Sequence, residues 1–438
     1  MSEALLGTLL LGLLFFCFAI GLEIALSLAL VGVLGLVYLK GWTTGLSVVG
    51  SIAWSNATSF NFIALPLFVF MSAVLLHSGI GKGLFTAVSK WVGFLPGGMA
   101  VASVLSCAIF AAVSGSSVAT AATIGLIAIP EMERRGYARP LIIGSLAAGG
   151  TLGILIPPSI PMIIYGVMTE TSIGHLYMAG IVPGILLALM FVAYIVVYAT
   201  LRPEVAPRSP EDHGTLAEKI AGLHEMGPVA LLVFVVLGSM YIGIVTPTEA
   251  AALGSLVSLM LAAWMRALSW AKLKQAFYET VRTTSMVMLI IIFASIFSHV
   301  IALIGTPRAL MENIVGLDLP KWAFFVLVFA VLLAIAYALE ELSVMIIILP
   351  ILFPLVVAFG FDAVWFGIIM IVWLEIGFIT PPVGLNLFVI QGMMPGASAR
   401  EVTVGTTPFV LLMIAMVALL FVFPEIALWL PQHSMPAK

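Results

Sequence analysis

Two short polar runs interrupt otherwise apolar stretches of the sequence and bring oxygen atoms to the middle of them. The first run is Ser114-Gly115-Ser116-Ser117, with Thr120 close behind, and the second is Glu340-Glu341-Leu342-Ser343. Hydroxyl, carboxylate and carbonyl oxygens are hard ligands that suit an ion such as Na⁺. Deep in a membrane the carboxylates would bind a cation or carry a proton, whereas in contact with water they would be ordinary solvated groups. Packing of small residues between helices is the alternative role of the serine run.

Two double prolines follow these runs. Each lies among small or polar residues, which are Gly153, Pro157, Pro158 and Ser159 in the first case and Gly377, Thr380, Pro381, Pro382, Gly384 and Asn386 in the second. Proline removes a backbone donor and clashes with the carbonyl one turn earlier, so each pair predicts a broken helix. Broken backbone inside a membrane is tolerated where it is buried in protein or lines a cavity. A matched pair of breaks therefore indicates a transporter binding site, with capping of the broken helices as the alternative role of Ser159, Thr380 and Asn386.

The remaining polar residues favour transport over catalysis. No Lys or Arg lies deep inside an apolar segment, so an anionic substrate would be held by helix N-termini, amides and hydroxyls. No nucleophile–base pair, H-E-x-x-H motif or P-loop is present in the sequence. We therefore expect no enzyme activity, and any pumping would have to use an ion gradient.

The composition requires a membrane around these residues. Of 438 residues, 63% are hydrophobic and 8% are charged, and the mean hydropathy is +1.25, whereas about 25% of residues are charged in soluble domains. The chain is therefore predicted to be an all-α polytopic protein of the lipid bilayer, with no nucleic-acid partner. Cys17 and Cys107 lie in apolar runs and are expected to be buried small side chains.

About ten apolar segments are long enough to cross a membrane as helices. They cover residues 4–21, 24–40, 60–79, 139–168, 175–200, 228–246, 249–265, 284–305, 363–392 and 403–423. The polar runs lie in two further stretches, 93–130 and 320–358. We interpret these stretches as re-entrant helical hairpins, with a pair of full crossings as the alternative for each. The motif Thr246-Pro247-Thr248-Glu249 predicts a capped helix start.

The distribution of basic residues predicts the orientation. With both stretches returning to their starting side and both termini in the periplasm, only Lys40, Arg308, Lys321 and Lys438 of the 17 Lys and Arg residues lie outside. The remaining 13 then lie in cytoplasmic loops, as the positive-inside rule requires. The count is the same whether each stretch is a hairpin or a pair of full crossings. It therefore predicts the orientation of the chain and not how deeply the two stretches enter the membrane.

Landmarks of the first half recur in the second half at an offset of about 224–226 residues. We predict a first repeat over 1–201 with hairpin 93–135 and broken helix 139–168, a cytoplasmic linker over 202–226, and a second repeat over 227–438 with hairpin 320–358 and broken helix 363–392. Five crossings and one hairpin in each half would start the second copy on the opposite side of the membrane. Inverted repeats of this kind are typical of alternating-access transporters.

The motifs in combination resemble one transporter family. They include Ser114-Gly-Ser-Ser-Val-Ala-Thr120, Gly149-Gly-Thr-Leu-Gly153, Ile156-Pro-Pro-Ser-Ile-Pro161 and Thr380-Pro-Pro-Val-Gly-Leu-Asn386, together with Ala64-Leu-Pro-Leu-Phe68 and Thr246-Pro-Thr-Glu-Ala250. In these stretches the chain is similar to the DctM-like large membrane subunit of tripartite ATP-independent periplasmic (TRAP) transporters, which belong to the ion-transporter superfamily. The resemblance extends over nearly the entire chain.

This resemblance implies an elevator-type fold in the bacterial inner membrane and Na⁺-coupled import of an organic anion such as a C4-dicarboxylate or a sugar acid. It also implies two partners, a periplasmic substrate-binding (P) protein and a small four-helix membrane (Q) subunit. No additional helices precede the first span, so a separate Q subunit is expected. A stand-alone Na⁺/anion symporter of the same superfamily is the alternative function, followed by a channel or scaffold subunit.

The resemblance also carries site residues onto this sequence. The first Na⁺ site would comprise Ser114, Gly115, Ser116, Ser117, Gly153 and Pro157, and the second Glu340, Glu341, Ser343, Gly377, Thr380 and Pro381. The substrate would lie between them, against Ser117, Thr120, Pro158, Ser159, Pro382, Gly384 and Asn386. The Glu-Glu tip is more acidic than this family pattern leads us to expect.

Overall fold

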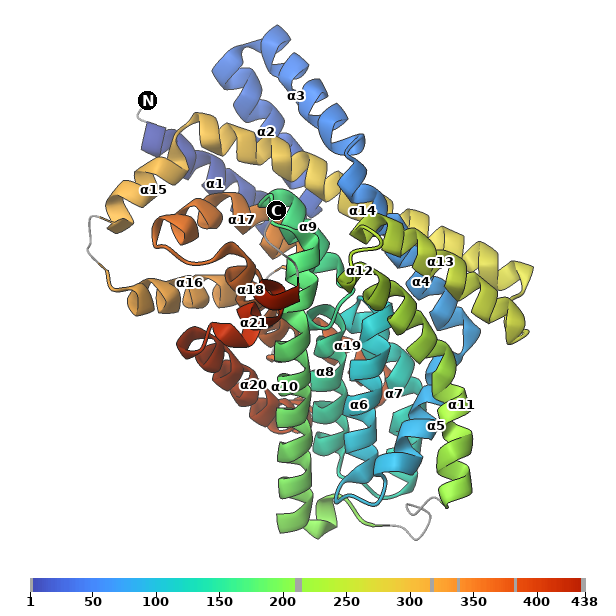
Figure 1. The fold of residues 1–438 in the computed structure, drawn as a ribbon. Coiled ribbons are helices and arrows are strands. Elements are labelled where there is room, and N and C mark those ends of the chain that lie inside the picture. Colours follow the sequence, from blue (N-terminus) through green and yellow to red (C-terminus); the bar gives the residue numbers. More distant parts are fainter. Residues whose placement is uncertain (1–2, 209–214, 316–318, 337–338, 382–383, 435–438) are drawn as a thin grey trace.

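The computed structural model describes residues 3–208, 215–315, 319–336, 339–381 and 384–434. In this part of the chain all regular secondary structure is helical (Figure 1). Among these residues, eight helical segments are long and apolar enough to cross a membrane. The predicted class, an all-α polytopic membrane protein, is therefore confirmed.

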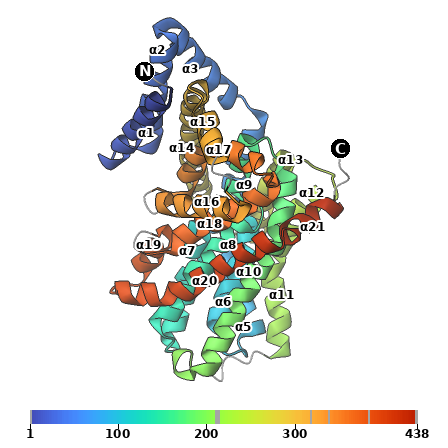
Figure 2. The ribbon, with the colours of Figure 1, turned by 90° about the vertical axis from the view of Figure 1, so that its left-hand side faces the viewer.

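In the described part of the chain, five α-helices precede the first hairpin. They are α1 (Glu3–Ala19), α2 (Ile24–Lys40), α3 (Trp42–Ala57), α4 (Ala64–Ser78) and α5 (Ile80–Val92), with a 3-10 turn at Phe60–Ile63. Apolar runs alone do not reveal α3, because threonine, serine and asparagine interrupt its sequence. Figures 1 and 2 show α1, α2 and α3 at one end of the molecule, away from the lower ends of α5 and α11 (Leu216–Val233).

The first polar run lies between two helices of similar length, α6 (Gly98–Ser114) and α7 (Ser117–Arg134). Gly115 ends α6 with φ +62°, a left-handed conformation that glycine adopts without steric cost. The first broken helix follows as α8 (Arg139–Leu155) and α9 (Ile160–Met168), and the long α10 (Ile173–Leu201) completes the first half.

The remaining elements follow α10 along the chain. After a 3-10 turn at Pro203–Val205 come α11, a π-helical stretch Phe234–Gly238, α12 (Ser239–Tyr241), α13 (Pro247–Trp264), α14 (Trp270–Leu303) and α15 (Thr306–Val315). Next are α16 (Lys321–Ala336), α17 (Glu341–Ala358), α18 (Ala363–Ile379), α19 (Leu385–Met393), α20 (Ala399–Val422) and α21 (Glu425–Ser434). Helix α11 begins inside the segment 202–226, and Thr246 and Glu249 form the expected capping box at the start of α13.

The first broken helix and the first part of the second, α18, lie inside the protein. In the segment Arg139–Met168, 89% of the most apolar window is buried, whereas the other seven candidate membrane spans are 33–50% buried among the described residues. Helix α8 packs against α6, α7, α18 and α20, and every residue of α18 from Trp365 to Ile379 is buried. Backbone groups released by Pro157 and Pro158 are therefore surrounded by protein rather than lipid, as an interrupted membrane helix requires.

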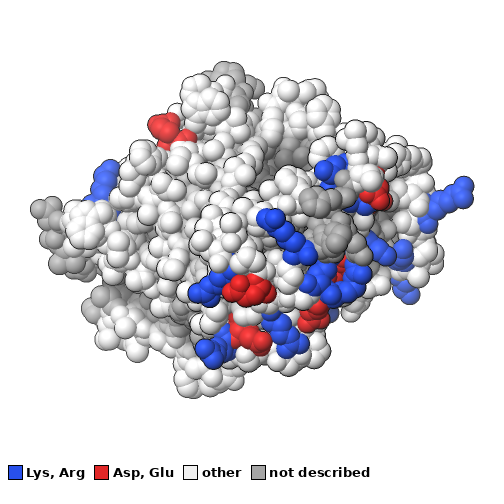
Figure 3. Space-filling model, turned by 90° about the horizontal axis from the view of Figure 1, so that it is seen from below, with Lys and Arg blue, Asp and Glu red and all other residues white. Residues whose placement is uncertain are grey.

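Charged side chains gather at the end of the molecule where α7 meets α8. Glu131 accepts hydrogen bonds from Arg134 and Arg135, with ion-pair distances of 2.8 and 2.7 Å, and Arg139 lies 3.6 Å from Glu133. The hydrogen bond from Arg134, followed by that from Arg135, holds the pKa of Glu131 below its ordinary value. Figure 3 shows Lys and Arg interleaved with Asp and Glu on the face seen from below. The predicted cytoplasmic location of these residues remains a prediction.

Candidate functional site

The tip of the first hairpin lies directly against the first broken helix. A Cβ atom on Gly115 would stand 2.8 Å from the carbonyl oxygen of Pro158, and one on Gly153 would stand 2.6 Å from the carbonyl oxygen of Ser116. Any side chain at either position would therefore push the two elements apart. The structure thus brings together the tip, Gly153 and the proline pair, which the sequence grouped into one site.

Hydroxyl groups at this tip converge on one backbone carbonyl. Ser114 Oγ donates to the carbonyl oxygen of Ser116 at 3.2 Å, and Thr120 Oγ1 donates to the same oxygen at 2.8 Å. Ser116 also serves as the N-cap of α7, because its Oγ accepts from the backbone N–H of Ala119 at 3.4 Å. Ser114, Ser117 and Thr120 are buried. The result is a group of hard oxygens at a buried helix N-terminus.

The first break is compact and buried. Helix α8 ends at Leu155, a cis peptide bond joins Pro157 to Pro158, and Ser159 Oγ caps α9 by accepting from the backbone N–H of Met162 at 3.5 Å. The carbonyl oxygen of Ser159 accepts from Tyr177 Oη at 3.5 Å. The capping role that we considered for Ser159 is therefore present.

Asn386 connects the second broken helix to the first hairpin. Its Nδ2 atom donates to Ser117 Oγ at 2.5 Å and to the carbonyl oxygen of Ala147 on α8 at 3.5 Å. Its Oδ1 atom is buried and has no hydrogen-bond partner among the described residues. A buried amide oxygen without a donor is costly, so this atom is poised to accept a hydrogen bond or to bind a cation.

Ser72 is a contact of the tip that the sequence analysis missed. Its Oγ lies 2.5 Å from the carbonyl oxygen of Ser114 and 3.0 Å from that of Val113, so one hydroxyl from α4 holds the C-terminal end of α6. Helix α4 packs mainly against α13 and α14, outside the hairpin and the broken helices. A serine in the middle of the apolar segment 60–79 was the only signal in the sequence.

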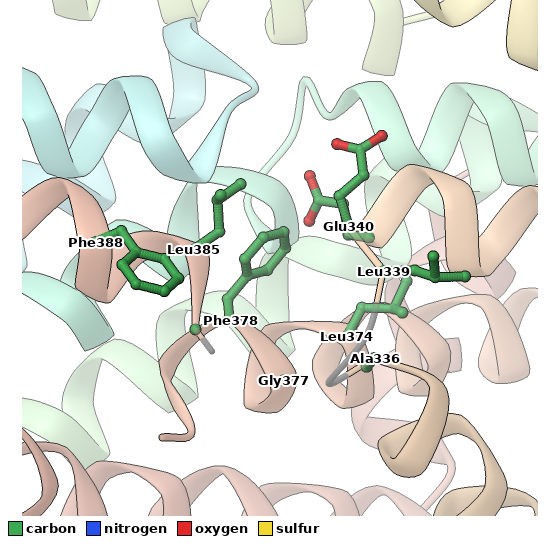
Figure 4. Close-up of a pocket in the computed structure, with 10 residues that line it drawn as sticks. Ala336, Leu339, Glu340, Leu374, Gly377, Phe378, Leu385 and Phe388 are labelled. Carbon is green, nitrogen blue, oxygen red and sulfur yellow. The ribbon is translucent and has the colours of Figure 1, made fainter. Parts of the chain in front are cut away.

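The second hairpin and the second break enclose a cavity of about 120 Å³ (Figure 4). Its lining comprises Ala336, Leu339, Glu340, Glu341, Leu374, Gly377, Phe378, Gly384, Leu385 and Phe388. Glu340 Oε1 accepts from Ser343 Oγ at 3.1 Å, and Thr380 Oγ1 donates to the carbonyl oxygen of Ile376. Pro381 follows directly, whereas Pro382 lies outside the described residues. The structure therefore brings Glu340, Glu341, Gly377 and Gly384 together.

Glu375, on α18, adds an acidic side chain close to this cavity. It is 0% exposed, and neither of its carboxylate oxygens has a hydrogen-bond partner in the described part of the chain. It lies close enough to Glu341 for the two carboxylates to repel each other when both are charged. Oε2 of Glu341 is likewise buried without a partner among the described residues. No group of three His, Cys, Asp or Glu side chains that could hold a metal ion occurs among the described residues.

A helical membrane protein in which a helical hairpin packs against a buried, interrupted helix has the architecture of a membrane transporter. The solved YdaH transporter of Alcanivorax borkumensis shares the fold, with a TM-score of 0.59 and 16% identity over 89% of this chain and 90% of that one. The sequence model of the tripartite ATP-independent periplasmic transporter DctM component matches residues 11–426. This chain belongs to that family of large permease subunits, which are transport proteins and not enzymes.

Curated relatives agree with this assignment. The chain is 37% identical to the C4-dicarboxylate TRAP transporter large permease protein DctM of Pseudomonas aeruginosa, over 86% of this chain and 88% of the relative. It is 35% identical to the isethionate TRAP transporter permease protein DctMQ of Oleidesulfovibrio alaskensis. That match covers 94% of this chain and 64% of the longer relative.

Proposed function

We propose that this chain imports an organic anion by Na⁺-coupled secondary transport, as the permease subunit of a TRAP system in the bacterial inner membrane. The observation that carries the proposal is the contact of Asn386 with Ser117 and Ala147, which joins elements of both halves in one buried polar site. Na⁺ is cargo in this scheme. The oxygens of Ser114–Ser117 would hold one ion and those of the second tip another, with the substrate between them.

The proposed substrate is a small organic anion, and a C4-dicarboxylate is the first candidate. One relative is named for C4-dicarboxylates and another for isethionate, which is a small sulfonate anion. Helix N-termini at Ser116 and Ser159 supply backbone N–H groups that favour negative charge. A periplasmic binding protein would deliver the substrate, and a small four-helix membrane subunit would complete the permease.

We further propose an elevator movement, in which the hairpins and broken helices move together against the other helices. Tight packing of α6, α7, α19 and α20 against α8 supports treating these helices as one moving unit. The contacts of α14 with α2 and of α13 with α4 support a separate supporting unit. The hydrogen bonds from Ser72 would cross the boundary between the two units.

Reconstitution in proteoliposomes tests the proposal. Uptake of a labelled C4-dicarboxylate should require an inward Na⁺ gradient together with the binding protein and the small subunit. Uptake without any binding protein would favour the stand-alone symporter. Flux that ignores the Na⁺ gradient would favour a channel and overturn Na⁺ coupling.

A further inference from the structure

Carboxylates occupy positions in the second half at which the first half has hydroxyl groups. Helix α7 starts at Ser117 and α17 at Glu341, and Pro157 corresponds to Pro381, so both pairs are separated by 224 positions (341 − 117 and 381 − 157). At the same offset, the N-cap Ser116 corresponds to Glu340 and Thr151 corresponds to Glu375. Three neutral side chains are thus replaced by three acidic ones in the same structural positions.

The first half shows that packing does not require these acids. Thr151 is 0% exposed like Glu375, but its Oγ1 donates to the carbonyl oxygen of Ala148 at 2.7 Å and is therefore satisfied within its own helix. Ser117 likewise has a partner in Asn386. The corresponding carboxylates of Glu341 and Glu375 leave three oxygens buried without a donor.

Two interacting carboxylates without a donor or a basic partner are strongly disfavoured in a buried site. No ion pair joins Glu341 or Glu375 to a basic side chain in the part of the chain that the structure describes. Glu341 lines the cavity, and Glu375 lies on α18 between Leu374 and Gly377, which also line it. Oxygen-only ligands select hard cations. An acidic group inside a membrane protein commonly marks an ion pathway.

We propose that Glu341 and Glu375 bind a co-transported cation directly, in a carboxylate-lined site of the second half that differs in chemistry from the hydroxyl-lined tip of the first half. This inference rests on the proposed Na⁺-coupled transport and adds Glu375 as a ligand. Because a carboxylate oxygen that binds a cation carries more negative charge than a hydroxyl or carbonyl oxygen, this site should bind Na⁺ more tightly than the hydroxyl-lined tip does.

Thermal unfolding of the full-length chain in lipid nanodiscs tests this site without measuring transport. The melting temperature is followed while Na⁺ replaces choline at constant ionic strength. Ligand binding to the folded state raises the melting temperature in the wild type. In Glu375→Gln and in Glu341→Gln, the melting temperature without Na⁺ should rise, because the neutral amide avoids the cost of burying an ionisable acid without a partner. The Na⁺ concentration for half-maximal stabilisation should increase at least about tenfold in both variants, equivalent to about 1.4 kcal/mol.

The two variants lie on different helices, so the test survives if one of them does not fold. Glu425→Gln, which removes an exposed charge at the start of α21, is the control and should behave as the wild type. A wild-type protein that does not respond to Na⁺ would contradict the proposed coupling itself. A wild-type response that both Gln variants retain, with unchanged melting temperatures in choline, would overturn the carboxylate site and leave the proposed coupling standing.

Discussion

The side-chain amide of Asn386 lies 2.5 Å from the hydroxyl of Ser117, although the two residues are 269 positions apart. One residue belongs to the second broken helix and the other to the first hairpin. A movement of either element must therefore move the other or break a buried hydrogen bond. This contact therefore joins the second broken helix and the first hairpin in one buried polar cluster.

We expect Ser117 and Asn386 to act as a unit. Ser117→Ala and Asn386→Ala should each reduce Na⁺-driven uptake, and the double variant should lose little more than either single variant, because the shared hydrogen bond is already absent. The coupling energy from this double-mutant cycle should fall between about 0.5 and 3 kcal/mol. A parallel cycle of Asn386→Ala with Ser103→Ala, whose hydroxyl bonds the carbonyl of Met99 in its own helix, should be additive. Additivity in both cycles would contradict the role of the contact.

Close packing at the first tip predicts a strong effect of one methyl group. Gly153→Ala would place Cβ 2.6 Å from the carbonyl oxygen of Ser116 and 2.8 Å from Thr120 Oγ1. We expect a loss of about 1–3 kcal/mol in stability, measured by thermal unfolding. The control is Gly50→Ala in the middle of α3, where a Cβ meets nothing within 4 Å. That variant should be neutral or stabilising, since alanine favours the helix, and an equal loss in both would rule out the packing explanation.

The hydrogen bonds of Ser72 predict that α4 steadies the first hairpin. Ser72→Ala should accelerate hydrogen exchange of the amides around Gly115, because losing one buried hydrogen bond costs about 1 kcal/mol. Ser78→Ala is the matched control on the same helix, since Ser78 Oγ donates to the nearby carbonyl oxygen of Leu75. If both variants exchange like the wild type, Ser72 does not hold the tip.

The predicted orientation can be tested with thiol labelling in intact cells. Cys17 and Cys107 are only 2% and 0% exposed, so the native background should be low. A membrane-impermeant maleimide should label Lys40→Cys directly. Glu204→Cys, in the exposed segment after α10, should react only after the membrane is permeabilised. The opposite pattern would invert the topology.

Much of the fold could be predicted from the sequence because its signals are local. Apolar length identifies membrane helices, and the double prolines at Pro157 and Pro381 interrupt helices wherever the chain places them. Gly115 marks the reversal between α6 and α7, because glycine adopts the left-handed backbone conformation without steric cost. The family likewise follows from the order of residues alone, and the inverted repeat is predicted from it.

Only the tertiary structure decided which of these elements meet. The sequence predicted Asn386 and Ser117 in one substrate site without pairing them, and neither Glu375 nor Ser72 was among its predicted site residues. Hydrogen bonds between residues distant in the chain depend on how helices pack, and single polar residues in apolar helices do not encode their partners. The pairing of Ser117 with Asn386, and the burial of Glu375 beside Glu341 without a donor, therefore became visible only in the folded chain.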